Sequence, residues 1–117
     1  MIDPKYKLSG EGLPVTTKRG MTYKDGVVIP SGTPLWVYFT ENKLNFLVFE
    51  YQGKTRATRV ELAYKTFGSK FKKAPSMKSL ERMSNDGVVT TPLGAHTEPD
   101  GFGPDGESSW LMVLGMI

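Results

Sequence analysis

The chain has 117 residues, enough for one compact domain that buries roughly 65% of the surface its unfolded form exposes. Its apolar fraction of 38% and charged fraction of 23% are typical of a soluble globular protein. The absence of cysteine excludes a disulfide framework, a thiol nucleophile and thiolate metal sites. The N-terminus has no apolar signal core, and the longest apolar run, residues 110–117, is too short to span a bilayer. We therefore expect neither secretion nor membrane insertion.

The net charge of +3 is distributed unevenly along the chain. Residues 1–82 hold all fifteen Lys and Arg residues together with seven acidic residues, so that this part carries a charge of +8. The remainder carries five acidic residues and no Lys or Arg, a charge of −5. This asymmetry indicates either a body that binds a polyanion and has an acidic end, or two ends that attract each other within one fold.

Residues 21–60 predict β-structure. Asp25-Gly26 is a hairpin signal between residues 21–24 and 27–29. In the segment TPLWVYFT the alternation places Leu35, Val37 and Phe39 on one face and the aromatic residues between them on the other. Tight turns then lead into LNFLVFEY and TRATRV. Four or five short strands are too few for a sandwich and favour a small closed barrel of SH3-like type.

The pattern after Val60 predicts short helices and one hairpin. ELAYKTFG fits two helical turns that end at Gly68, and Ser76 is placed to cap a helix from Met77 to about residue 85, with Gly87 as its left-handed end. Three residues of that helix are spaced to face the core: Met77, Leu80 and Met83. VVTTP and AHTE predict a two-stranded hairpin, and Ser108 or Ser109 can cap a last short helix, WLMVL.

We therefore expect an α+β fold that is mostly β. An N-terminal arm (residues 1–11) precedes an SH3-like β-barrel (residues 12–68), and a helix–wing unit (residues 69–117) ends in a short helix that packs back as a clip. The two units are expected to fold as one cooperative domain. Five apolar side chains are expected to anchor the clip: Trp110, Leu111, Val113, Leu114 and Ile117.

The basic stretch from Lys65 to Arg82 is the first candidate functional site. Lysines attract phosphates whatever the base sequence, and exposed aromatic rings can stack on unpaired bases. Here Tyr64, Phe67 and Phe71 are interleaved with the basic residues. The alternative is that these rings belong to the core and the lysines form a solvated rim. The candidate binding residues, with two arginines of the preceding strand, are Arg56, Arg59, Lys65, Lys70, Lys72, Lys73, Lys78 and Arg82.

The acidic loop from Glu98 to Glu107 is the second candidate. Hard cations prefer oxygen ligands, but compared with a calcium-binding loop, Phe102 occupies a ligand position and Ser109 replaces the closing glutamate. Consecutive Asp-Gly and Pro-Asp-Gly turns that direct Trp110 into the core are the preferred interpretation. We therefore expect no metal and no cofactor.

Nothing in the sequence indicates catalysis. The single histidine, His96, has no cysteine partner, and no nucleophile elbow, phosphate-binding loop or zinc-protease motif occurs. His96 with Glu98 on the same strand face is the one candidate pair, and it specifies no substrate. We expect a protein that is not an enzyme.

The segment SMKSLERMSNDGVVTTPLGAHTE resembles the helix–wing half of MerR-like and excisionase-like DNA-binding domains. In such domains a serine-capped helix enters the major groove and the following hairpin touches the backbone. The resemblance implies that Lys78 and Arg82 contact phosphates or bases. The hairpin here departs from the pattern because it has no Lys or Arg and runs into the acidic loop. A plain packing unit is the alternative.

The longer segment from about Gly53 to the end resembles a group of small, mostly uncharacterised proteins of tailed bacteriophages. The residues that carry the resemblance are APSMKSLERMSNDGVV, then Gly94, then TEPDGFGPDGESSWLMVLGMI. Ala74 and Ser108 stand where that group often has proline. The resemblance implies a phage-encoded protein located in the host cytoplasm, and it implies no established activity.

Together these observations predict a non-enzymatic binding protein whose partner is nucleic acid. The alternative partner is a protein, in which case the chain inhibits or modulates a host enzyme or an antiviral defence complex. A structural component of the virion is a third interpretation, which predicts ordered oligomers in solution. No membrane partner is expected.

Overall fold

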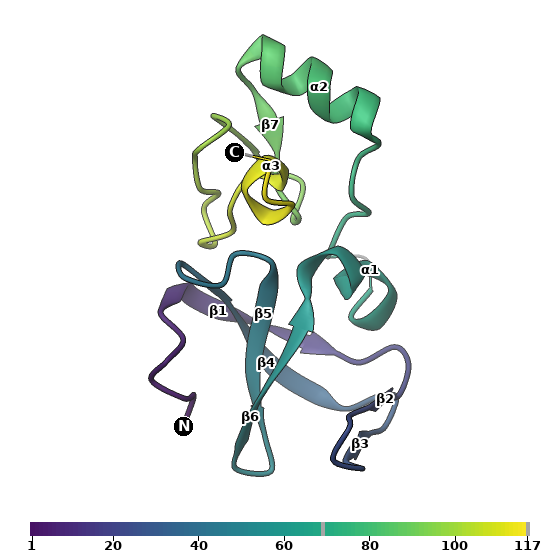
Figure 1. Cartoon of the computed structure of the whole chain (residues 1–117). Helices are drawn as coiled ribbons and strands as arrows, with labels where there is room; N and C mark the ends of the chain where they lie inside the picture. The colour runs from purple at the N-terminus through teal and green to yellow at the C-terminus, as the bar shows by residue number, and fades with distance from the viewer. Residues whose placement is uncertain (69, 117) are drawn as a thin grey trace.

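A four-stranded antiparallel sheet forms the body of the molecule (Figure 1). The structure is a computed structural model and describes residues 1–68 and 70–116. The sheet has the order β1-β4-β5-β6, with strands β1 (Leu8–Thr16), β4 (Pro34–Thr40), β5 (Phe46–Tyr51) and β6 (Lys54–Arg59). Two short hairpins accompany it: β2 (Met21–Thr22) with β3 (Val28–Ile29), and β7 (Val89–Thr90) with β8 (His96–Thr97). The helices are α1 (Ala63–Thr66), which follows a 3-10 turn (Val60–Leu62), α2 (Met77–Asp86) and α3 (Trp110–Val113).

The predicted α+β fold with mostly β-structure is confirmed. In β4 the side chains of Leu35, Val37 and Phe39 are buried on one face, while Trp36 on the other face is 49% exposed. This alternation follows from the two-residue period of a strand whose one face packs on the core. The hairpin predicted at Asp25-Gly26 is also present, and Gly26 has the positive φ of 86° that the turn requires.

The first strand lies before residues 21–60, the segment for which the sequence predicted β-structure. β1 starts at Leu8, inside the segment that we expected to be an arm, and it pairs with β4 along most of its length. Its pattern was hard to recognise because Gly10 and Gly12 both have positive φ and the register shifts between Ser9 and Leu13. The residues before β1 are also tied to the sheet, since the Asp3 amide donates to Thr55 Oγ1 at 2.7 Å.

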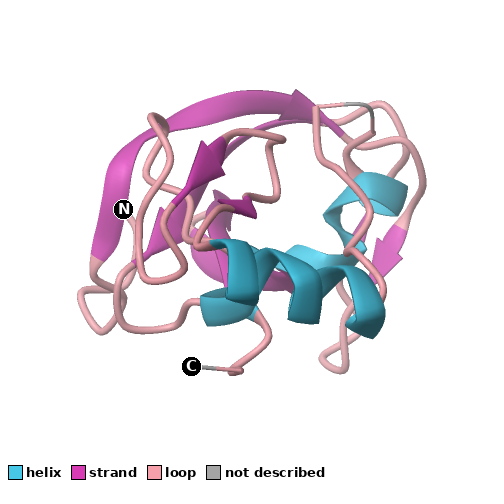
Figure 2. Ribbon diagram, turned by 90° about the horizontal axis from the view of Figure 1, so that it is seen from above, coloured by secondary structure: helices cyan, strands magenta, loops and turns pink. Residues whose placement is uncertain are grey.

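The closed barrel that we expected is not detected. In the described residues β1 and β6 are the two outer strands, and no pairing joins them. The reason lies after β6, where the chain enters the 3-10 turn and α1 instead of a further strand. Ala63 and Phe67 from this region are buried in the core and cover the sheet in place of that strand. The sheet is strongly curved but open (Figure 2).

The predicted helix and hairpin after Pro75 are confirmed. The Ser76 side chain caps α2 by accepting a hydrogen bond from the Ser79 amide, and Gly87 ends the helix with a φ of 73°. Leu80 is buried and Met83 is half-buried, but Met77 is 62% exposed. The expectation that Met77 faces the core was therefore wrong, because it lies in the first turn, before the helix reaches the cluster.

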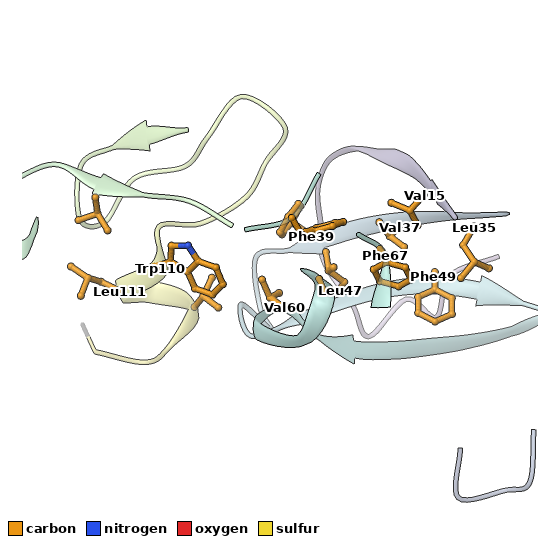
Figure 3. Packing of buried hydrophobic residues seen from close by; sticks show 14 of the residues in the cluster. Val15, Leu35, Val37, Phe39, Leu47, Phe49, Val60, Phe67, Trp110 and Leu111 are labelled. Atoms are coloured by element: carbon orange, nitrogen blue, oxygen red, sulfur yellow. The ribbon is translucent and has the colours of Figure 1, made fainter. Parts of the chain in front are cut away.

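The C-terminal helix packs back onto the body as predicted. Trp110 is 1% exposed and belongs to the same core cluster as Leu47 and Val60 of the sheet region (Figure 3). Leu111 and Val113 are buried with it, and Leu114 packs partly against the cluster. Ile117, the fifth predicted anchor, lies outside the described residues. A single cluster thus connects the sheet with the segment around α2 and α3.

No helix among the described residues is long and apolar enough to cross a membrane.

Candidate nucleic-acid interface

Six exposed basic side chains follow one another along the chain from α1 through α2. This segment runs along one edge of the molecule from α1 to α2 (Figure 1). We call these six residues the basic band: Lys65, Lys70, Lys72, Lys73, Lys78 and Arg82. Residues 62–82 contain these six basic residues and a single acidic residue, Glu81. The band is therefore a concentrated positive stretch of the surface.

The basic side chains of the band point toward solvent because their neighbours in the chain are buried. In α1, Ala63 and Thr66 are buried, so Lys65 between them points outward, and its Nζ lies 5.7 Å from the centre of the Tyr64 ring. In the connection to α2, Phe71 is 3% exposed and pulls the backbone against the core. Lys70 and Lys72 on either side of Phe71 are consequently exposed.

Two lysines of the band are held near the body. Lys70 Nζ donates to the carbonyl oxygen of Pro14 at 3.1 Å. The backbone of Lys72 donates to Pro92 O at 2.7 Å, and its side chain lies along Gly94, where an added Cβ would be 3.2 Å from Lys72 Cε. These contacts leave most donors of both ammonium groups free, because an ammonium group has three.

Lys78 and Arg82 extend the band along α2. They are four residues apart and therefore lie next to each other on one face of the helix. Leu80, two residues from each, is buried against the core, which puts both cations on the outer face. The helix is capped at both ends, so this pair is presented by a defined element and not by a loop.

The band has no ion pair in the described part of the chain. The salt bridges found there involve only residues from Met1 to Glu61, and none reaches an acidic residue of the C-terminal part. The interpretation that the basic and acidic ends neutralise each other within the fold therefore gains no support from ion pairs. The cations of the band are available to an external anion.

Arg56 and Arg59, unlike the cations of the band, are engaged in ion pairs among the described residues. Arg56 is 8% exposed, binds Asp25 Oδ2 at 2.9 Å and lies 4.8 Å from the centre of the Tyr23 ring, so it ties the β2–β3 hairpin to the sheet. This ion pair, with a second hydrogen bond from Lys54, holds the pKa of the Asp25 carboxyl well below its usual range. Arg59 is exposed, but it pairs with Glu61 at 2.5 Å.

Two of the three aromatic residues interleaved with the band belong to the core, and the third, Tyr64, is half-buried. Phe67 and Phe71 are buried, and their ring centres lie 5.9 Å apart in a row that continues to Phe39 and Phe49. Of the two interpretations of these rings, stacking on bases is therefore wrong for Phe67 and Phe71, and the alternative that they belong to the core holds. They were drawn into the core because the sheet is open there and leaves apolar surface to be covered.

The acidic loop is a structural element. Glu107 is fully buried, accepts hydrogen bonds from Thr91 Oγ1 at 3.1 Å and from the Asp105 amide at 3.0 Å, and burial raises the pKa of its carboxyl group. Ser9 Oγ donates to Gly106 O at 2.7 Å, which fastens the loop to β1. In the part of the chain that the structure describes, no group of three or more potential ligands is placed to hold a metal ion.

A groove beside the band was missed by the sequence analysis. It has a volume of about 790 Å³, lies between the end of β1 and the start of β4, and includes the exposed Trp36. Its lining residues are Pro14, Val15, Thr16, Thr17, Lys18, Pro34, Leu35, Trp36, Phe67 and Lys70. The available signal was the strand alternation, which already put Trp36 on the face opposite to the core. Lys70 belongs to both the groove and the band.

Comparisons of the chain with models of protein families, with curated proteins and with solved structures found no match.

Proposed function

We propose that this protein is a non-enzymatic nucleic-acid-binding protein and that the basic band is its contact surface. The observation that carries the proposal is the set of six exposed cations without an ion pair among the described residues. Phosphate groups release condensed counterions when they are neutralised by Lys or Arg, so such a surface gains affinity from every phosphate it contacts. Arg56, which is buried, is not part of the proposed surface.

The resemblance to small proteins of tailed bacteriophages supplies the biological setting of this proposal. In that setting the protein is made in an infected bacterium and acts in the host cytoplasm. The fold assignment belongs to the same proposal: the strand order β1-β4-β5-β6, followed by a 3-10 turn, is consistent with an SH3-like barrel that is left open where α1 replaces the last strand.

The test is a matched pair of charge reversals. Lys72→Glu with Lys73→Glu alters the middle of the band, and Lys5→Glu with Lys24→Glu makes the same change in net charge at exposed positions outside it. Binding of labelled DNA is measured by fluorescence anisotropy at low salt. The change in the band should lower the affinity by at least about a hundredfold, since two attractive phosphate contacts become repulsive. The control pair should lower it only several-fold.

Equal losses in both double variants would mean that net charge, and not this surface, determines binding, and would refute the assignment of the band. If the unaltered protein binds no DNA at all but retains one stoichiometric, salt-resistant protein from a host lysate, the proposal is wrong, and the alternative of an inhibitor or modulator of a host protein replaces it.

A further inference from the structure

The groove at the end of β1 has an aromatic residue that is both exposed and rigidly held. Trp36 is 49% exposed, and its Nε1 donates to the carbonyl oxygen of Glu11 at 3.0 Å. Its indole packs on Gly12, where an added Cβ would lie only 2.3 Å from Nε1. Gly12 has a φ of 79°, so glycine is favoured there for both its conformation and its lack of a side chain. A ring fixed in this way loses little conformational entropy when a ligand packs on it.

The charged residues that line the groove are both positive. Lys18 and Lys70 are the two ionisable residues of its lining, and no Asp or Glu contributes to it. The Lys18 side chain lies over Gly68, where an added Cβ would be 2.2 Å from Lys18 Cε, and Lys70 is held by Pro14 O. The aliphatic parts of the Lys18 and Lys70 side chains are thus held against the protein, and both ammonium groups keep free donors for a phosphate.

Most of the remaining lining is apolar, which suits the face of a base. Pro14 is the cross-strand partner of Trp36, and Pro34 and the buried Leu35 and Phe67 continue the surface. An aromatic face beside cations is the arrangement with which proteins hold unpaired nucleotides: the base stacks on the ring and the backbone phosphates lie on the lysines. Bases that are paired in a duplex are stacked on each other and present only their edges.

The geometry points to a nucleotide-binding subsite in which Trp36 stacks on an unpaired base while Lys18 and Lys70 contact the adjacent phosphates. This inference rests on the proposed function, because Lys70 connects the groove to the basic band, and it specifies the ligand as single-stranded nucleic acid. The hairpin β7–β8 agrees with this choice, since a wing without Lys or Arg that leads into acidic residues is poorly suited to the backbone of a duplex.

The test compares two single strands of equal charge, a ten-residue oligothymidylate and an abasic strand of the same length. The unaltered protein should bind the oligothymidylate about five- to 150-fold more tightly, the range expected for loss of one stacked base. Trp36→Ala should lose this difference and bind both strands equally, whereas Trp36→Phe should keep most of it. Thermal unfolding of both variants checks that they are folded.

Replacement of the buried Trp110 makes a second readout possible. In a Trp110→Phe protein the remaining tryptophan fluorescence comes from Trp36, and stacking on thymine should quench it. Equal affinity for the two strands together with an unquenched Trp36 would overturn this inference but leave the proposed function intact, since the phosphate contacts would remain. Absence of binding to either strand would refute the proposed function itself. Quenching of Trp36 by a proline-rich peptide, with none by DNA, would reassign the groove to a protein partner.

Discussion

Replacement of Trp110 by alanine tests whether the sheet and the C-terminal clip form one cooperative unit. The indole is 1% exposed and packs between α3 and the sheet region (Figure 3). Removing a buried tryptophan side chain costs about 3–5 kcal/mol. A domain of this length has a total stability of about 6–18 kcal/mol, so the loss is a large fraction of it. At 117 residues this corresponds to a fall in melting temperature of about 10–25 °C.

The assay uses the fact that the chain has two tryptophans. In Trp110→Ala the remaining Trp36 lies on β4, far along the chain from the changed residue, and its fluorescence reports unfolding of the sheet. Urea unfolding followed by Trp36 fluorescence and by circular dichroism should give coincident transitions, both shifted to lower urea. Trp110→Phe, which keeps an aromatic ring, should show a smaller shift. If the Trp36 transition in Trp110→Ala occurs at the same urea concentration as in Trp110→Phe, the sheet is stable without the clip, and the prediction of one cooperative unit is refuted.

Further predictions concern the acidic loop and the helix cap. Burial raises the pKa of the Glu107 carboxyl group, so the stability that Glu107 contributes is present below its unfolded-state pKa and is lost as pH rises through its folded-state pKa. The free energy of unfolding of the unaltered protein minus that of Glu107→Gln should therefore fall between pH 4 and 8. A rise would contradict the raised pKa of Glu107. Gly103→Ala places a Cβ 1.9 Å from Glu107 Oε1 and should destabilise by about 1–3 kcal/mol, whereas Gly20→Ala, whose nearest neighbour is 3.6 Å away, should change stability by less than about 1 kcal/mol in the same urea titration. Ser76→Ala should cost about 1 kcal/mol through loss of the α2 cap, measured by thermal unfolding; an unchanged melting temperature would mean that α2 does not depend on this bond.

Local signals in the sequence predicted much of this structure. The alternation around Trp36, the Asp25-Gly26 turn and the Ser76 and Gly87 caps depend on a few adjacent residues, and each has the predicted conformation. β1 was not predicted as a strand, because its two positive-φ glycines and its bulge break the two-residue period. Closure of the sheet depends on which distant segments pair, and the local pattern does not contain that information.

The candidate site was also predicted only in part, because some of its features are local in the sequence and others depend on the fold. The sequence identified the cations of the band, because charge can be counted without a fold. It left open whether Phe67 and Phe71 are exposed, and the row of rings with Phe39 shows that tertiary packing decided this. The groove at Trp36 joins β1, β4 and Lys70, which are far apart in the chain, so only the fold brings them together.

The salt dependence of binding tests the central claim most directly. If the band neutralises about four to six phosphates of a single strand, the affinity measured by anisotropy should fall about 50- to 300-fold between 50 and 200 mM salt. A steep, linear decrease of the logarithm of affinity with the logarithm of salt concentration is the result that we predict. Absence of binding at 50 mM salt, or an affinity that does not change with salt, would contradict the proposal that this protein binds nucleic acid through the basic band.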